Sequence, residues 1–145
     1  MSFYADTSFL VSLYGSDAHS VRADLWRQTN PEPLPFTPLH RLECRNAIWL
    51  AVFQKRYSRM DADEVWRSVE VDVGAGLLIL SNVVPENLWL DAEALVEPHT
   101  SETGARSLDV LHVAAAKRLA VQEFVTFDPR QAALASRTGL QLSVL

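Results

Sequence analysis

The sequence has one cysteine, five glycines and no long apolar run. Cys44 alone cannot close a disulfide within the chain, so the fold depends on a packed core, and nothing indicates an oxidising compartment. The opening residues MSFYADTSFLV have no basic segment before their apolar ones, and no later stretch approaches the roughly 18 apolar residues of a membrane span. These absences predict a cytoplasmic protein that makes no membrane contact.

Positive charge is also scarce. Thirteen lysines and arginines face eighteen aspartates and glutamates, which gives a formal net charge of -5. A protein that grips nucleic acid through a broad cationic surface needs the opposite balance, because such binding depends on phosphate neutralisation and counterion release. Simple solubility would explain the acidity, so the positions of the acids carry more information than their number.

Short apolar segments alternate with helical patterns along the whole chain. The sequence has 145 residues, 48% of them hydrophobic, and no internal repeat or long linker, so we expect one domain over residues 1–145. Strands that alternate with helices predict a three-layer α/β/α domain with a mainly parallel central sheet. The expected strands are 2–5, 34–37, 77–84, 123–127 and 140–145, and the expected helices are 9–15, 17–28, 38–56, 58–73, 85–97, 108–120 and 129–137.

Two acids directly follow expected strands. Asp6 comes after the first strand, and Asp128 comes after the fourth. In an open parallel sheet, ligands bind outside the carboxyl ends of the strands, so both acids lie where a site would form. Each could equally be the N-cap of the next helix, which is a common role for aspartate. Their repetition at two strand ends favours a site.

Two further acids lie within apolar helical segments. Glu43 stands between Leu42 and Cys44, and Asp109 stands near the start of an alanine-rich helix. Either could face solvent, as charged residues in helices usually do. His112 shares a helix face with Asp109 through i, i+3 spacing, but a histidine on an apolar face is more often packed than catalytic. We therefore leave His112 out of the predicted catalytic set.

Four short motifs resemble those of a known family. In chain order they are DTS at 6–8, RLE at 41–43, RSLD-x-LH-x-AAA at 106–116 and T-x-D at 126–128. Together they closely resemble the PIN-domain family over essentially the full chain, and the length is similar to that of the VapC-type toxins within that family. One such motif would be a weak signal, whereas four in the right order are a strong one.

The resemblance implies both a fold and a chemistry. It implies a three-layer PIN-like domain whose acidic pocket holds one or two Mg²⁺ or Mn²⁺ ions and cuts RNA phosphodiester bonds. Carried over by position in the motifs, the metal-binding and catalytic acids are Asp6, Glu43, Asp109 and Asp128. The hydroxyl groups that would orient ligands or water are those of Thr7 or Ser8 and of Thr126.

The physical chemistry of converging acids agrees with a metal site. Unit charges about 4 Å apart repel by roughly 4 kcal/mol at an effective dielectric of about 20, so such carboxylates protonate or bind a cation. The chain has no cysteine and histidine cluster of the zinc type, and carboxylate oxygens favour a hard ion such as Mg²⁺ or Mn²⁺. That ion would also explain how an acidic pocket accepts an anionic RNA backbone.

Partners are indicated partly by the resemblance and partly by the residues. The resemblance implies the toxin of a toxin-antitoxin pair, held inactive by a small antitoxin protein. Arg106, Arg41 and Arg45 are candidate contacts to RNA, and surface ion pairing is the alternative for them. Large apolar residues on two helices predict a homodimer, since one small domain does not readily bury them all. These residues are Trp49, Val52, Phe53, Trp66, Val69 and Val73.

Two other functions remain open. A catalytically inactive PIN-like scaffold would bind RNA or protein without cleavage, although the presence of all four acids argues against it. A phosphohydrolase would use Asp6 as a covalent nucleophile at the end of the first strand. That class usually has a second aspartate two residues later, where this chain has Ser8.

Overall fold

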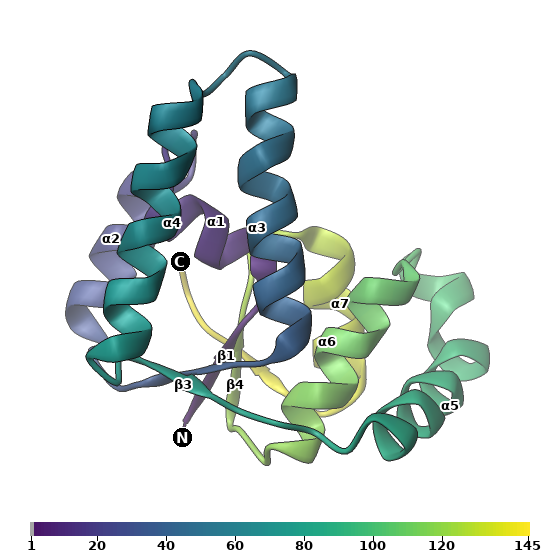
Figure 1. The fold of residues 1–145 in the computed structure, drawn as a ribbon. Helices are drawn as coiled ribbons and strands as arrows, with labels where there is room; N and C mark the ends of the chain where they lie inside the picture. The colour runs from purple at the N-terminus through teal and green to yellow at the C-terminus, as the bar shows by residue number, and fades with distance from the viewer. Residues whose placement is uncertain (1) are drawn as a thin grey trace.

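The computed structural model describes residues 2–145, in which short strands alternate with helices along the chain (Figure 1). The elements are β1 (Phe3–Ala5), α1 (Thr7–Tyr14), α2 (Ser20–Thr29), β2 (Leu34–Phe36), α3 (Pro38–Phe53), α4 (Arg59–Gly74), β3 (Leu78–Leu80), α5 (Pro85–Thr103), α6 (Ser107–Arg118), β4 (Glu123–Val125), α7 (Pro129–Arg137) and β5 (Gln141–Leu142).

All strand pairs in residues 2–145 are parallel. β1 pairs with β4, with Phe3 opposite Glu123, and β4 pairs with β5. β2 pairs with β3, with Leu34 opposite Leu78, and β2 lies beside β1. The strands thus follow the order β3, β2, β1, β4, β5, with hydrogen-bonded pairing in two groups. The prediction of an α/β domain with a mainly parallel sheet is confirmed.

Side chains of the central strands alternate between two helical layers. Tyr4 and Phe124 stack with ring centroids 5.6 Å apart and pack against α5, α6 and α7. Phe3, Ala5 and Val125 point to the other face, where they pack with residues of α1 to α4. Figure 1 shows the same division, with α2 and α4 on one side of the strands and α5 and α6 on the other. This is the period-two pattern of strands buried on both faces.

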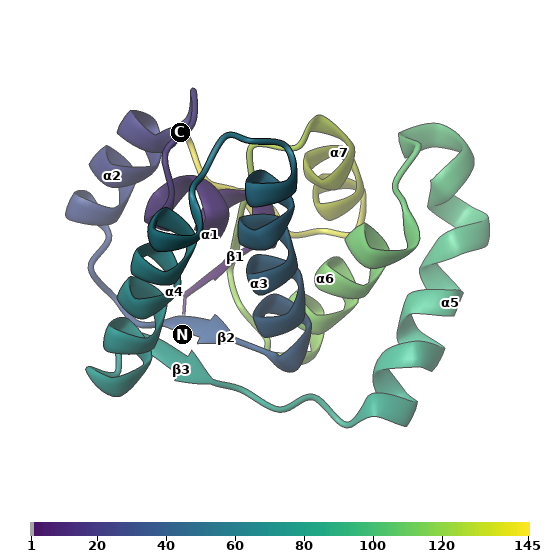
Figure 2. The same cartoon turned by 45° about the horizontal axis from the view of Figure 1, so that its top comes forward.

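The helices α3 and α4 form a hairpin whose tip projects from the body of the molecule (Figures 1 and 2). A capping box starts α4. The Ser58 hydroxyl accepts from the backbone N–H of Asp61, and the Asp61 carboxylate accepts from the backbone N–H of Ser58. Thr37 caps α3 in the same way, with His40 as its partner, so the cap also places His40 in the core.

Three expected elements differ most in length from those of the structure. The helix expected to end before Pro98 continues as α5 to Thr103, because proline removes only one N–H donor and the left-handed Gly104, with φ of 66°, ends the helix instead. The strand expected over 77–84 is only β3, and the strand expected over 140–145 is only β5. Both are edge strands, where one neighbour alone supplies hydrogen bonds, so pairing stops early.

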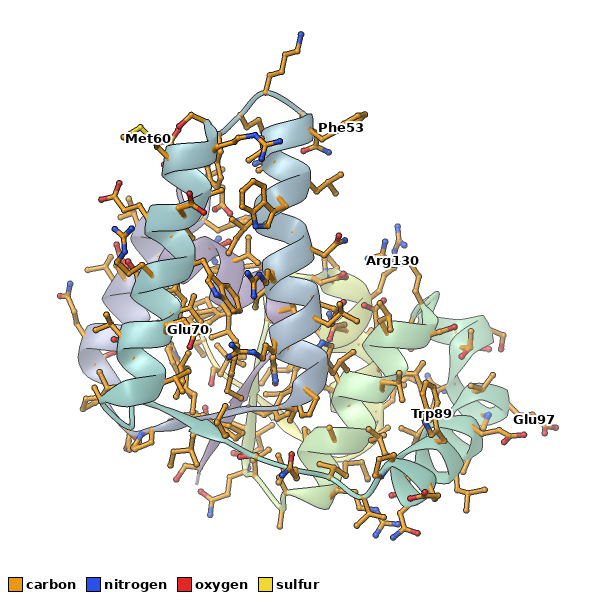
Figure 3. The ribbon with its side chains drawn as sticks, viewed as in Figure 1. Phe53, Met60, Glu70, Trp89, Glu97 and Arg130 are labelled. Atoms are coloured by element: carbon orange, nitrogen blue, oxygen red, sulfur yellow. The ribbon has the colours of Figure 1, made fainter. Side chains whose placement is uncertain are left out.

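The apolar residues of α3 and α4 divide between core and surface. Val69 is buried, and Trp66 and Val73 pack against the same core, so these three do not supply the free surface expected of them. Phe53 is 82% exposed near the tip of the hairpin (Figure 3), and Leu42 is 71% exposed. None of the helices described for residues 2–145 has both the length and the apolar character of a membrane span.

Candidate active site

Asp6 lies fully buried at the carboxyl end of β1, where it receives hydrogen bonds from several elements. Its Oδ1 accepts from the backbone N–H of Phe9 at 2.9 Å, which makes Asp6 the N-cap of α1. Its Oδ2 accepts from the Thr126 hydroxyl at 2.5 Å and from the Gln131 amide at 2.7 Å. The Ser8 hydroxyl reaches both oxygens, at 2.8 and 2.9 Å. Asp6 is therefore a helix cap and also the meeting point of α1, β4 and α7.

Burial dominates the electrostatics of Asp6. Removal from water raises the pKa of the Asp6 carboxyl group, and the hydrogen bonds from Thr126, Phe9 and Ser8 oppose this rise only in part. A carboxylate in such surroundings is stabilised by a proton or by a cation close to it. Asp6 thus has the environment of a site residue rather than of a solvated surface acid.

Glu43 points from α3 toward the buried face of α6. Its Oε1 accepts from the Thr7 hydroxyl at 3.0 Å and is hydrogen-bonded to Nε2 of His112. Nδ1 of His112 is hydrogen-bonded to the Tyr4 hydroxyl at 2.7 Å, so the imidazole links the sheet to Glu43. Burial alone would raise the pKa of Glu43, but the hydrogen bond and charge of His112 outweigh it and lower that pKa, with smaller contributions from the Thr7 hydrogen bond and the charge of Arg106.

His40 fixes the backbone immediately before Asp6. Its Nδ1 accepts from the backbone N–H of Thr37 at 3.0 Å, so Nε2 carries the proton and donates to the carbonyl of Ala5 at 2.8 Å. Burial, followed by the nearby His112, lowers the pKa of His40 well below its ordinary value. A neutral, buried imidazole therefore ties α3 to the end of β1.

Asp109 and Asp128 lie at the starts of α6 and α7 and share one arginine. Oδ2 of Asp109 accepts from the backbone N–H of Arg106 at 2.9 Å and lies 3.4 Å from its Nε. Oδ2 of Asp128 lies 3.6 Å from Nη2 of the same guanidinium. The two aspartate side chains are 7% and 19% exposed, whereas that of Arg106 is 69% exposed. A single solvent-facing cation thus neutralises both acids.

Short links connect the four acids at the carboxyl edge of the sheet. The Thr126 hydroxyl donates to Asp6 and accepts from the backbone N–H of Asp128 at 2.9 Å. Thr7, which follows Asp6 in the chain, donates to Glu43. Arg106 completes the set by joining Asp128 to the remaining acid of α6. The fold therefore gathers residues that are 122 positions apart in the sequence, from 6 to 128.

The acids fit a hard divalent cation in kind but not in spacing. Carboxylate oxygens are the ligands that Mg²⁺ and Mn²⁺ prefer. Within residues 2–145, however, no three side chains of Asp, Glu, His or Cys converge closely enough to hold one ion. Each carboxylate is instead satisfied from inside the protein, by neutral hydroxyl and amide groups at Asp6, by His112 at Glu43, and by Arg106 at the other two.

Arg41 and Arg45 are not brought together with the acids. Both guanidinium groups lie over the ring of Trp66 in α4, at 5.2 and 5.0 Å from its centroid. Arg41 also forms an ion pair with Glu70. Of the three arginines considered as RNA contacts, only Arg106 lies beside the acids.

Sequence analysis missed the residue that bridges α7 to Asp6. Gln131 is 4% exposed, and its Oε1 is buried without a hydrogen-bond partner in the described part of the chain. Its amide group must present N–H to Asp6, because an ionised carboxylate only accepts hydrogen bonds. The position of Gln131 in the first turn of α7 could have identified it. Gln131 follows Asp128 by three residues, and side chains in the first turn of a helix lean toward its N-terminus.

Comparison with known proteins places the chain in a family. Residues 3–136 match the family model described as the PIN domain. A search of curated proteins gave no significant match.

Solved structures provide similar folds. VapC20 of Mycobacterium tuberculosis, a toxin that cleaves the sarcin-ricin loop, has a TM-score of 0.69 at 18% identity, and the match covers 96% of each chain. PAE2754 of Pyrobaculum aerophilum has a TM-score of 0.61 at 18% identity over 98% of this chain and 89% of that one. FitAcB of Neisseria gonorrhoeae has a TM-score of 0.64 at 11% identity over 98% and 96%. At these identities the likeness establishes the fold.

Proposed function

Because the chain belongs to the PIN domain family, we propose that it is a divalent-metal-dependent endoribonuclease that hydrolyses RNA phosphodiester bonds and acts as the toxin of a toxin-antitoxin pair. The observation that carries this proposal is the linked set of four acids at the carboxyl edge of the sheet. Two of them follow strands, two come from helices, and Thr7, Thr126 and Arg106 connect them.

The proposal gives each residue of the pocket a role. An ion bound by the acids would supply an activated water and offset charge that develops on the phosphate. Thr126 holds Asp6 and the backbone of Asp128 in place, while Thr7 orients Glu43 and Ser8 orients Asp6. Arg106 is the arginine placed to contact phosphate. The ligands for Mg²⁺ or Mn²⁺ are Asp6, Glu43, Asp109 and Asp128.

The partners in this proposal are RNA, a small antitoxin and a second copy of the chain. The fold-level likeness to VapC20, itself a toxin, supports the toxin role. Phe53, which belongs to the residues that predicted a homodimer, is exposed on α3, and so are Leu42 and Leu50 of the same helix. This exposure supports a homodimer, since an apolar surface of this kind is usually covered. Cytoplasmic residence is part of the same proposal, because the RNA substrates of a toxin are found there.

Cleavage of a purified RNA mixture tests the proposed activity. We expect fragments in the presence of Mg²⁺ or Mn²⁺, no cleavage with EDTA, and no support from Ca²⁺, whose looser coordination positions water poorly. Asp6→Asn should abolish cleavage, whereas Asp91→Asn, which changes an exposed acid paired with Arg118, should not. Undiminished cleavage in excess EDTA would contradict a metal mechanism.

Binding without cleavage would favour the second candidate, an inactive PIN-like scaffold. The failure of three potential ligands to converge in residues 2–145 is the observation that keeps this candidate open. Calorimetry with Mn²⁺ separates the two, because a scaffold has no need of a cation at the acids, whereas the nuclease requires it. Sequencing of the fragments would then identify the RNA target.

A further inference from the structure

The cluster of four acids already contains a cation that belongs to the protein itself, the guanidinium of Arg106. The guanidinium of Arg106 lies 3.4 Å from Oδ2 of Asp109 and 3.6 Å from Oδ2 of Asp128. Glu43 lies outside this arrangement, because its carboxylate is hydrogen-bonded to His112 and Thr7. One arginine therefore pairs with two carboxylates, at the starts of α6 and α7.

We infer that Arg106 is the internal counter-ion of this pocket, and that its guanidinium occupies the place between Asp109 and Asp128 that a divalent ion has to enter. The inference rests on the proposed function, since it assumes that these acids bind metal. It accounts for the absence of three converging ligands in residues 2–145, because a planar guanidinium between two carboxylates holds them apart.

Release of Arg106 requires movement rather than loss of a proton. A guanidinium stays charged at every pH at which the protein is folded, so it cannot make room by deprotonation. The geometry favours movement. Both contacts are longer than the 2.7–2.9 Å that is typical of charge-assisted hydrogen bonds, and 69% of the side chain is exposed. The backbone contact from Arg106 to Asp109, at 2.9 Å, persists when the side chain turns away.

Affinity for Mn²⁺ tests the counter-ion role without any RNA. Removal of a competitor that is 69% exposed and held by two long ion pairs should tighten binding, and we expect Arg106→Gln to bind Mn²⁺ about three- to tenfold more tightly than wild type in calorimetry. The matched control is Arg130→Gln. The side chain of Arg130 extends from α7 into solvent (Figure 3), and its guanidinium forms no ion pair in residues 2–145. Its backbone N–H donates to Asp128, a contact that the substitution keeps, and the change in net charge is the same.

The control separates direct competition from the general field of a positive charge. Arg130→Gln should bind Mn²⁺ within about twofold of wild type, because a solvated charge is largely screened at physiological ionic strength. Equal tightening in both variants would overturn the inference, and so would unchanged or weaker binding by Arg106→Gln.

A second measurement follows the side chain directly. In ¹⁵N spectra of the arginine Nε–H groups, titration with Mg²⁺ should shift the Arg106 signal and speed its exchange with water, while the Arg130 signal stays in place. An Arg106 signal that is unchanged at saturating Mg²⁺ would contradict release.

The outcomes distinguish this inference from the proposed function. If wild type binds Mn²⁺ and Arg106→Gln binds it no more tightly, only the counter-ion role is wrong. If neither protein binds Mn²⁺, the metal site itself is wrong, and the inference fails with it. Binding by Arg106→Gln alone would support both.

Discussion

The two sides of the acidic pocket neutralise their carboxylates by different means. On the Asp6 side, the acid is fully buried, and neutral donors from α1, β4 and α7 surround it. On the other side, Asp109 and Asp128 depend on the guanidinium of one exposed arginine. Neutral donors packed in a core are held by the fold, whereas an exposed ion pair is weak and open to exchange.

This difference gives the two sides of the site different roles. In the proposed metal site, the Asp6 side would set the position of one ligand in advance, since His40 also fixes the backbone at Ala5. The Asp109 and Asp128 side is held by a contact that, in the same proposal, an incoming cation replaces. A site of this design keeps its shape without metal and still avoids a cluster of unpaired negative charges.

The largest expected effect concerns the buried side, through Thr126→Val. Valine has the shape of threonine but removes the donor to Asp6 and the acceptor for the backbone N–H of Asp128. Loss of a hydrogen bond to a charged group, with a buried partner left unsatisfied, should lower the free energy of unfolding by about 2–3 kcal/mol. Urea denaturation in EDTA measures this change.

Thr29→Val is the control for this substitution. Thr29 is exposed, and its hydroxyl donates to carbonyls of its own helix and accepts from the side-chain amide of Asn30, so its loss should change the free energy of unfolding by less than about 0.5 kcal/mol. If Thr126→Val and Thr29→Val lower the free energy of unfolding equally, the hydrogen bonds around Asp6 are not unusually stabilising.

The next effect concerns pH and His40. Burial lowers the pKa of His40 in the folded protein, so below about pH 6.5 the unfolded chain binds a proton that the folded chain excludes. The stabilisation is fully present above that pH and is lost as the pH falls toward the folded-state pKa, by up to about 1.4 kcal/mol per pH unit. Urea denaturation between pH 7 and pH 5 measures the slope.

His40→Gln should flatten that slope. Glutamine keeps an N–H group that can donate to the carbonyl of Ala5, but it does not titrate. The variant should be less stable at pH 7 and lose less stability on acidification. The same slope in both proteins would show that His40 does not carry this pH dependence, and the ring packed against it, His112, would then be examined by the same substitution.

Substitution of a single acid by its amide should change the melting temperature differently on the two sides. Because burial raises the pKa of Asp6, the charged form is unfavourable in the metal-free fold, and Asp6→Asn should melt at the same temperature as wild type or higher. The unpartnered Oε1 of Gln131 can accept from the new amide after a flip of its own. Asp109→Asn should instead lose a few tenths to about 1 kcal/mol, since it weakens its contacts to Arg106 at the start of α6.

Thermal melts of both variants in EDTA make this comparison. Added Mn²⁺ should raise the melting temperature of wild type and do less for either variant, because a ligand that binds only the folded state stabilises it. If both substitutions shift the melting temperature of the metal-free protein in the same direction, the two sides are not electrostatically distinct.

The sequence predicts the acids that follow strands better than the acids that lie within helices. Asp6 and Asp128 could be placed at one edge because parallel strands end there, and this rule needs only the order of strands and helices. The direction of Glu43 cannot be derived, since Arg41 and Arg45 flank it on the same helix and leave solvent exposure as an open alternative. Its contact with His112 depends on how α3 and α6 pack, which no local pattern specifies.

Long-range polar contacts are the part that sequence reasoning could not reach. Gln131 and Asp6 are separated by 125 positions, and a glutamine in a helix has no periodicity that marks it as buried. His112 was expected to be a packed residue, and its 1% exposure agrees with that. Its hydrogen bond to Glu43 also makes it a neighbour of the four acids. The end of α5 was missed for a local reason, because Pro98 was given more weight than Gly104.

The smallest expected effect is also the sharpest test of the comparison. Arg106→Gln in EDTA should change the free energy of unfolding by less than about 1 kcal/mol, because its ion pairs are exposed and long. Two contributions oppose each other. The variant loses attraction to Asp109 and Asp128, but a long side chain no longer has to be held in one conformation. The backbone N–H of residue 106 still donates to the Asp109 carboxylate.

Salt should reduce the difference in the free energy of unfolding between wild type and Arg106→Gln further, since screening weakens exposed pairs. Urea denaturation at about 20 mM and about 500 mM NaCl measures both numbers. A loss as large as that of Thr126→Val, or one insensitive to salt, would mean that Arg106 is a structural part of the rim rather than a replaceable cation.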